Sequence, residues 1–301
     1  MFGKKIFIQL KLTLILCAVL FLAVSSLARE EGEPLILQEM TWTDVRDYLE
    51  ECDMVIIPIG STEQHGPHLP LGTDYYEALG MSKLISARTG VVVAPVLLAG
   101  YSEYHSGFQG TLSLKPETLE QVLFETAEML MRYGFRRFMF FNYHGGNNLS
   151  QQKVIHRINH TTEAIAVAIG HGSPIQKGRY QEKDEVGDEH AGIGETSLML
   201  FFKPELVKME RAEKPKATYN AKLEEIWALS QQYPDFYMVF NALRGVPVET
   251  KKGGASHELY NNGIWSFSDP RKATKERGEK QVTGMVTYAV EFIETWKKAK
   301  K

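Results

Sequence analysis

Short apolar runs alternate with amphipathic stretches over the first two thirds of the chain. Four runs rich in β-branched and aromatic residues predict buried strands, at 54–59, 91–98, 135–141 and 163–170. Apolar residues recur at helical spacing between these runs, over 75–89, 116–133 and 149–161. Gly90 follows the first of these predicted helices, where a glycine commonly ends a helix. This alternation predicts an α/β fold with a mostly parallel sheet that is covered on both faces.

The segments outside this alternation are less regular. The pattern predicts short helices over 35–51 and 198–202, and a further helix over 219–233. Residues 251–262 are rich in glycine and predict a loop. A last helix is predicted over 283–298, and it ends in lysines, which are favourable at a helix C-terminus.

The first 28 residues have the pattern of a secretory signal peptide. Three lysines precede an uncharged apolar run at 12–24, and small residues follow it up to Ala28. The run is shorter than the roughly 20 apolar residues of a membrane span, although an uncleaved anchor is the alternative. We therefore expect an exported protein, periplasmic or secreted, with residues 29–301 as a single domain and no membrane contact after cleavage.

Composition and charge narrow the class of protein. The chain is 44% hydrophobic and 24% charged, which permits a full core. Loss of the three lysines in the first 28 residues would take the formal net charge from −3 to −6. Such mild acidity argues against a nucleic-acid partner, since phosphate binding needs clustered basic residues. Cys52 would be the one cysteine of the mature chain, so no disulfide could form within it.

Candidate chemistry follows the predicted strands. The run at 54–59 breaks at Gly60 into a polar loop that carries Glu63, His65 and Asp74. Glu63 and His65 are two residues apart and would point the same way in an extended segment. His144 follows the third strand, and His190 and Glu195 come later. Loops at the carboxyl ends of adjacent parallel strands share one edge of the sheet, so these groups can form one site.

The proposed ligands are too many for one closed tetrahedral zinc site. They are Glu63, His65, Asp74, His144 and Glu195. Five such groups suit two divalent ions about 3.5–4 Å apart, each with an open position for water. Asp74 is the candidate bridge between the two ions. A mixture of carboxylate and imidazole ligands favours Zn, Mn or Fe.

Several ordered motifs resemble the creatininase (creatinine amidohydrolase) family over about residues 38–295. They are GSTEQHGPHLPLGTD at 60–74, GFQGT at 107–111, NYHGGN at 142–147, HAGIGETS at 190–197 and GIWS at 263–266, with DP at 269–270, AT at 273–274 and Gly278 after them. The resemblance implies a three-layer αβα sandwich, two divalent metal ions, and hydrolysis of C–N bonds in amides, often cyclic ones. It also implies a homo-oligomer, commonly a hexamer. The family's metal ligands carry over to Glu63, His65, Asp74 and His144.

One position departs from creatininase proper. That enzyme places a metal-binding glutamate two residues after the histidine that matches His144, and this chain has Gly146 there. In this respect the chain is similar to the His-Gly-Gly-Asn branch, which includes formamide hydrolases and a peptide-trimming protease. Glu195 is then the expected replacement ligand. The departure argues against creatinine as the substrate.

The other candidate residues would bind substrate or move protons. We expect His190, with Glu195, to act in catalysis, the alternative for His190 being a hydrogen bond that supports a ligand. His105, Gly145, Gly146 and Asp188 are candidate substrate-binding residues. The leading hypothesis is an exported, metal-dependent amidohydrolase that acts on a small amide, cyclic amides included. The alternatives are a peptidase or deformylase on the same site, or a metal- or ligand-binding protein without turnover.

Overall fold

The structure is a computed structural model that describes residues 32–96, 99–170, 188–218, 221–233 and 256–299, together with residues 236 and 239. The predicted signal peptide, residues 1–28, lies outside these ranges. So do parts of the predicted strand at 91–98, of the helix at 219–233 and of the loop at 251–262. No helix within the described ranges is long and apolar enough to cross a membrane.

In the described part of the chain, four parallel strands form the central sheet, in the order β2-β1-β3-β4. They are β1 (Met54–Ile59), β2 (Val92–Val93), β3 (Arg137–Asn142) and β4 (Ile165–Gly170). Ile59 pairs with Asn142, and Asn142 pairs with Gly170, so three strands end at the same level. Every residue of β1 and β3 is buried, as the continuous apolar runs predict for strands covered on both faces.

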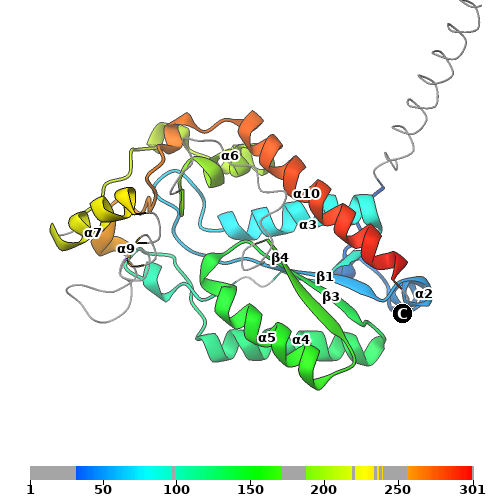
Figure 1. Ribbon diagram of the computed structural model, residues 1–301. Coiled ribbons are helices and arrows are strands. Elements are labelled where there is room, and N and C mark those ends of the chain that lie inside the picture. Colours follow the sequence, from blue (N-terminus) through cyan, green and yellow to red (C-terminus); the bar gives the residue numbers. More distant parts are fainter. Residues whose placement is uncertain are drawn as a thin grey trace, which may run out of the picture.

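Helices cover both faces of this sheet (Figure 1). One face packs against α2 (Trp42–Glu51), α4 (Pro116–Tyr133) and α5 (Asn148–Thr161). The other packs against α3 (Thr73–Thr89), α6 (Ile193–Phe202) and α10 (Lys275–Lys298). The two cores contain alternate residues of β1, with Val55 and Ile57 in one and Met54 and Ile56 in the other. This arrangement confirms the predicted three-layer αβα sandwich.

Among the described residues, helices α7 (Ala221–Gln232) and α9 (Ser256–Leu259) lie apart from these layers (Figure 1). Short 3₁₀ turns connect the other elements. They are η1 (Leu37–Glu39), η2 (Glu103–His105), η3 (Gly145–Asn147), η5 (Pro204–Leu206), η6 (Met209–Arg211) and η8 (Pro270–Lys272). Ser256–Leu259 was predicted as loop, so α9 is a correction there.

The ends of several elements differ from the sequence prediction. Strand β2 comprises only two residues, and the last hydrogen bond of its ladder runs from the Ala94 N–H to the Ile56 carbonyl oxygen. Helix α10 begins at Lys275 rather than residue 283, with Thr274 accepting a hydrogen bond from the backbone of Arg277. Glycine made this first turn hard to predict. A Cβ at Gly278 would lie 2.0 Å from the carbonyl oxygen of Ser197, so glycine is what lets α10 approach α6.

A buried arginine joins the sheet to the end of α10. Arg137 donates from Nε to Asp53 Oδ1 at 2.6 Å and from Nη1 to the Trp296 carbonyl oxygen at 2.9 Å. Its guanidinium also lies over the Trp296 ring. The Arg137 and Asp53 side chains are only 10% and 12% exposed, so each depends on the other for its charge compensation.

We expect Arg137→Ala to lower the free energy of unfolding by about 3–5 kcal/mol, because it leaves the Asp53 carboxylate buried without its partner. Arg132→Ala is the matched control, since Arg132 and Glu128 form an exposed pair at 3.8 Å. Its cost should be at most about 1 kcal/mol. Urea unfolding of both variants measures the difference, and equal losses in the two would contradict the assigned role of Arg137.

Candidate active site

The first strand delivers three candidate ligands to the carboxyl edge of the sheet. Strand β1 runs into Gly60, and Asp74 lies in the first turn of α3. A Cβ at Gly60 would lie 2.8 Å from the backbone nitrogen of Tyr75, so only glycine lets α3 start this close to the strand. Ser61 Oγ donates to Asp74 Oδ2 at 2.7 Å across the same turn. The loop thus returns Asp74 to the vicinity of Glu63 and His65.

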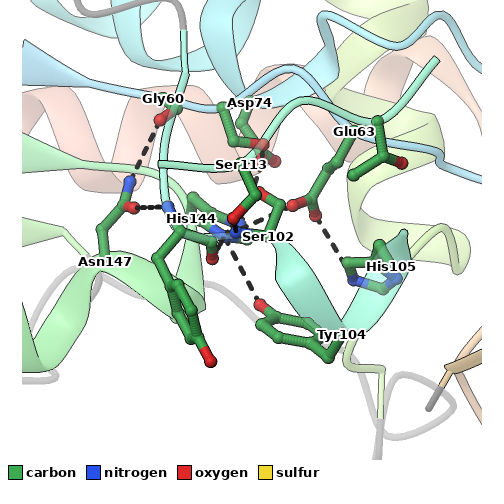
Figure 2. Close-up of polar contacts among 12 residues, drawn as sticks. Gly60, Glu63, Asp74, Ser102, Tyr104, His105, Ser113, His144 and Asn147 are labelled. Atoms are coloured by element: carbon green, nitrogen blue, oxygen red, sulfur yellow. Dashed lines mark hydrogen bonds and ion pairs between the residues drawn. The ribbon is translucent and has the colours of Figure 1, made fainter. Parts of the chain in front are cut away.

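Asp74 presents its two carboxylate oxygens to two different histidines. Its Oδ1 lies 3.1 Å from His65 Nε2, and its Oδ2 lies 3.1 Å from His144 Nδ1. His65 Nε2 is also 3.6 Å from Glu195 Oε2. Glu63 contributes on the other side, with Oε2 3.3 Å from His144 Nε2. Figure 2 shows Asp74, Glu63 and His144 converging in this way.

These contacts resolve into two groups that share Asp74. One is Glu63, Asp74 and His144, and the other is His65, Asp74 and Glu195. In each group the potential ligand atoms lie within 4.8 Å of one another. The potential ligand atoms of a third combination, Glu63, His65 and His190, also lie within 4.8 Å of one another. The geometry therefore brings together all five of the predicted ligands and adds His190.

In three of the site histidines, one ring nitrogen lies within hydrogen-bond distance of a backbone carbonyl oxygen. His65 Nδ1 lies 3.1 Å from the Glu63 carbonyl, and His144 Nε2 lies 2.9 Å from the Tyr101 carbonyl. His190 Nε2 lies 2.6 Å from the Gln64 carbonyl. A carbonyl can only accept, so these ring nitrogens donate, and in the neutral rings the opposite nitrogens would offer their lone pairs to a metal ion. This is the usual arrangement around metal-binding histidines.

The burial of the site carboxylates and their repulsion of one another also favour the binding of cations. Glu63 is fully buried, and neither carboxylate oxygen has a hydrogen-bond partner among the described residues. Burial raises the pKa of Glu195 to about 8, although the nearby His65 opposes the rise. Burial would lower the pKa of His65, but the Asp74 and Glu195 carboxylates raise it to about 10. The donor set, three carboxylates together with imidazoles, fits divalent ions such as Zn or Mn.

Two more histidines line the cluster. The His190 ring lies between those of His65 and His105, tilted against the first and stacked on the second, with ring centroids 4.2 Å away on each side. His105 Nε2 lies 3.4 Å from Glu63 Oε1, the contact drawn in Figure 2. Burial lowers the pKa of both His105 and His190 well below 6.5, which leaves both rings neutral near pH 7. His105 is thus part of the cluster rather than a solvated loop residue.

The three other predicted substrate contacts have distinct surroundings. Gly145 is exposed, and a Cβ there would meet nothing within 4 Å. A Cβ at Gly146 would lie 2.2 Å from the Tyr101 carbonyl and 2.5 Å from His144 Nε2, so no carboxylate side chain fits there. Asp188 accepts from Ser266 Oγ, Ser268 Oγ and the Gly194 backbone N–H. These bonds hold the start of α6, and the substrate-binding role of Asp188 stays a prediction.

Several residues at the site were not among the predicted site residues. Tyr104 stacks on His144 with an interplanar angle of 11° and meets Trp265 edge-on. Gln64 contacts both His105 and His190, and Ser256 Oγ lies 2.9 Å from His105 Nδ1. Tyr104 and Gln64 adjoin predicted site residues in the sequence, which is the signal that could have found them. Ser256 carries no such signal, because it reaches the site from α9.

Comparison with known proteins agrees with the motifs. A family model described as "Creatininase: Creatinine amidohydrolase" matches residues 38–293. A mycofactocin precursor peptide peptidase of Mycolicibacterium smegmatis is 35% identical over 257 residues, covering 81% of this chain and 85% of that protein. A 3-dehydro-scyllo-inosose hydrolase of Thermotoga maritima is 33% identical over 191 residues, covering 61% of each.

Solved structures show the same fold. A crystal structure of creatinine amidohydrolase superposes with a TM-score of 0.68 at 22% identity, over 89% of this chain and all of that one. Two other creatininase structures, with TM-scores of 0.67 and 0.65, are described as an Mn form and as a mutant of the Zn–Zn type. Those metals belong to those proteins. At such low identity the likeness establishes the fold alone.

Glu77 gives a test of the electrostatics near the cluster. It is fully buried, and both carboxylate oxygens lack hydrogen-bond partners among the residues described. Burial raises its pKa well above the ordinary 4.5, and the Glu195 and Asp74 carboxylates add to the rise. Ionisation is then easier in the unfolded chain, so Glu77 lowers stability increasingly as pH rises above about 4.5.

Glu77→Gln removes this ionisation at nearly constant size. We expect its Tm to exceed that of the wild type by a margin that grows as pH rises from about 4.5 towards 8. Glu39→Gln, at an exposed position, is the control and should give a constant difference. Calorimetry of chelator-dialysed protein over this pH range measures both. Parallel Tm curves for Glu77→Gln and the wild type would show that Glu77 does not ionise unfavourably.

Proposed function

This chain belongs to the creatininase family and is a hydrolase, and from that premise we propose that it hydrolyses a C–N bond of a small amide with two divalent metal ions. The observation that carries the proposal is the division of the site into two ligand groups that share Asp74. A carboxylate shared in this way, with imidazoles on both sides, suits a two-metal hydrolase.

Each ion would have its own ligands. Glu63, Asp74 and His144 would hold one, and His65, Asp74 and Glu195 the other. When bound, such ions supply a water of lowered pKa and polarise the carbonyl oxygen of the substrate. We propose Zn, Mn or Fe, because the ligands combine carboxylate and imidazole. Gly146 leaves no room for a carboxylate side chain, which supports Glu195 as the fifth ligand.

His190 is the proposed proton carrier. Its Nε2–H donates to the Gln64 carbonyl, so its lone pair is on Nδ1, 3.5 Å from Glu63 Oε1. Because burial keeps the ring neutral, Nδ1 is able to accept a proton from the attacking water. The same nitrogen could then return the proton to the leaving amine. His105 supports this arrangement from the other side, with Nε2 directed at Glu63.

The substrate is proposed only as a class. The absence of a side chain at position 146 distinguishes this site from creatininase proper and argues for a small amide other than creatinine. A peptide is the second candidate, because the peptide peptidase relative matches 81% of this chain. Turnover is favoured over simple ligand binding, since each ligand group leaves positions open for water and substrate. Assembly into a homo-oligomer stays a prediction of the family resemblance.

A combined experiment tests this function. Purified protein is analysed for bound Zn, Mn and Fe, and is then supplied with lactams, formamides, creatinine and short peptides. We expect about two divalent ions per chain and hydrolysis of at least one non-creatinine amide. If the protein holds metal but cleaves nothing in the panel, the result would favour the alternative of a metal- or ligand-binding protein without turnover. Creatinine as the best substrate would contradict the argument from Gly146.

Glu195→Gln and Asp74→Ala should weaken metal binding to different degrees. Glu195→Gln preserves size and removes one anionic ligand, so we expect about one ion per chain and at least a tenfold loss of turnover. Asp74→Ala removes the ligand that the two ion sites share, so we expect it to abolish both metal binding and turnover. Glu103→Gln, at an exposed position in the neighbouring loop, is the control with normal content. Full metal occupancy in Asp74→Ala would refute the shared ligand.

We further propose that the protein is exported and cleaved before Arg29. The support is the basic, apolar and small-residue pattern of the first 28 residues. The expected mature chain starts near Arg29 when the gene is expressed in a bacterium with a secretion system. Intact mass of protein from the periplasm or medium measures this. A mass that includes residues 1–28, found in the membrane fraction, would instead identify an uncleaved anchor.

A further inference from the structure

One buried glutamine contacts two histidines of the site, His105 and His190. Gln64 is 5% exposed and lies between Glu63 and His65 in the sequence. Its side-chain nitrogen is 3.0 Å from His105 Nδ1 and 3.0 Å from His190 Nε2. Its backbone carbonyl is 2.6 Å from the same His190 nitrogen. Through these contacts a single residue can determine which nitrogen of each ring carries the proton.

The orientation of the Gln64 amide follows from its other end. The Gly66 backbone N–H donates to Oε1 at 2.9 Å, so that atom must be the oxygen. The NH₂ group therefore faces the two imidazoles. Gly263 makes room for this pose, since a Cβ there would lie 2.0 Å from Oε1. Gly263 also has a φ of +74°, a conformation that glycine adopts without strain.

The proton positions can then be assigned in turn. The Gln64 carbonyl requires a proton on His190 Nε2, so Nδ1 is the bare nitrogen whenever the ring is neutral. Since His190 Nε2 donates, it cannot accept from the Gln64 NH₂ group, and that group donates to His105 Nδ1. His105 must then carry its proton on Nε2, the nitrogen 3.4 Å from Glu63 Oε1. His190 Nδ1 lies 3.5 Å from the same oxygen.

We propose that Gln64 is a positioning residue that holds His105 and His190 in the same Nε2–H tautomer. His105 thereby turns its Nε2–H towards Glu63, and His190 turns the lone pair of its Nδ1 towards the same carboxylate. The inference rests on the proposed function for its purpose, since it makes His190 the proton acceptor and His105 the donor. The tautomers themselves exist whether or not the protein hydrolyses amides. The side chain of Gln64 sets His105, and its backbone sets His190.

Because the side chain of Gln64 acts on His105 and its backbone on His190, a side-chain substitution should change the tautomer of His105 alone. Gln64→Glu keeps the size and the backbone carbonyl but replaces the NH₂ donor by a carboxylate oxygen. His105 must then place a proton on Nδ1 to meet it, whereas His190 should keep its proton on Nε2. Ser256→Ala is the matched control, because it removes the other partner of His105 Nδ1 and leaves the amide in place. It should change neither ring.

Two-bond ¹H–¹⁵N correlation spectra of histidine-labelled, zinc-loaded protein near pH 8 test the assignment. Loss of signals in His105→Asn and His190→Asn identifies the two rings. We expect Nε2–H in both rings of the wild type, and a proton on Nδ1 of His105 alone in Gln64→Glu. A wild-type His105 or His190 with its proton on Nδ1 would overturn the proposal without any variant. A tautomer change in Ser256→Ala would assign control to Ser256 instead.

The spectra also separate this proposal from the proposed function. If no amide in the substrate panel is cleaved but the spectra are as expected, the tautomer assignment holds and the amidohydrolase assignment does not. If amides are cleaved while Gln64→Glu leaves the His105 spectrum unchanged, the reverse is true. Circular dichroism of Gln64→Glu confirms its fold, and the wild-type spectra decide the matter if that variant does not fold.

Discussion

The site depends on burying several carboxylates in one place and compensating them with imidazoles. Glu63, Asp74 and Glu195 are all desolvated, and desolvation opposes their charged forms. His65 and His144 offset this for Asp74, whose pKa falls well below 3.8 despite its burial. The compensation needs each imidazole to face a carboxylate oxygen, so the backbone carbonyls that orient the rings are as important as the rings. Bound divalent ions would complete the charge balance.

The sheet provides most of this geometry, and that part could be predicted from the sequence. Continuous apolar runs identify β1 and β3, and parallel strands end at one edge. His144 must therefore lie near the loop that follows Ile59, whatever the details of packing. Glu195 could be placed by its motif alone, since it starts a helix beyond the last strand. The structure puts it beside His65 and Asp74, as the two-ion interpretation requires.

Other features could not be predicted, for physical reasons that differ. The orientation of Gln64 depends on Gly263 and on two rings far along the chain, and local pattern carries none of these contacts. The start of α10 was obscured because glycine, normally unfavourable in a helix, is required there by close helix packing. Asp188 has the chemistry of a ligand-binding group, yet its oxygens are taken by two serines and a backbone N–H. Residue type indicates what a side chain can bind, and only the fold decides what it meets.

The two parts of the site come from segments that are far apart in the sequence. Glu63, His65 and His144 lie in loops that follow strands of the sheet and Asp74 starts α3, whereas Glu195 is on α6, which packs mainly against α10. An ion shared by Asp74 and Glu195 would act as a cross-link that closes a very long loop of the polypeptide. Ligand binding of this kind favours the folded state by mass action, in proportion to the logarithm of free metal concentration. Metal supply would then determine how long α6 and α10 remain docked on the sheet, and so the lifetime of the protein against proteases.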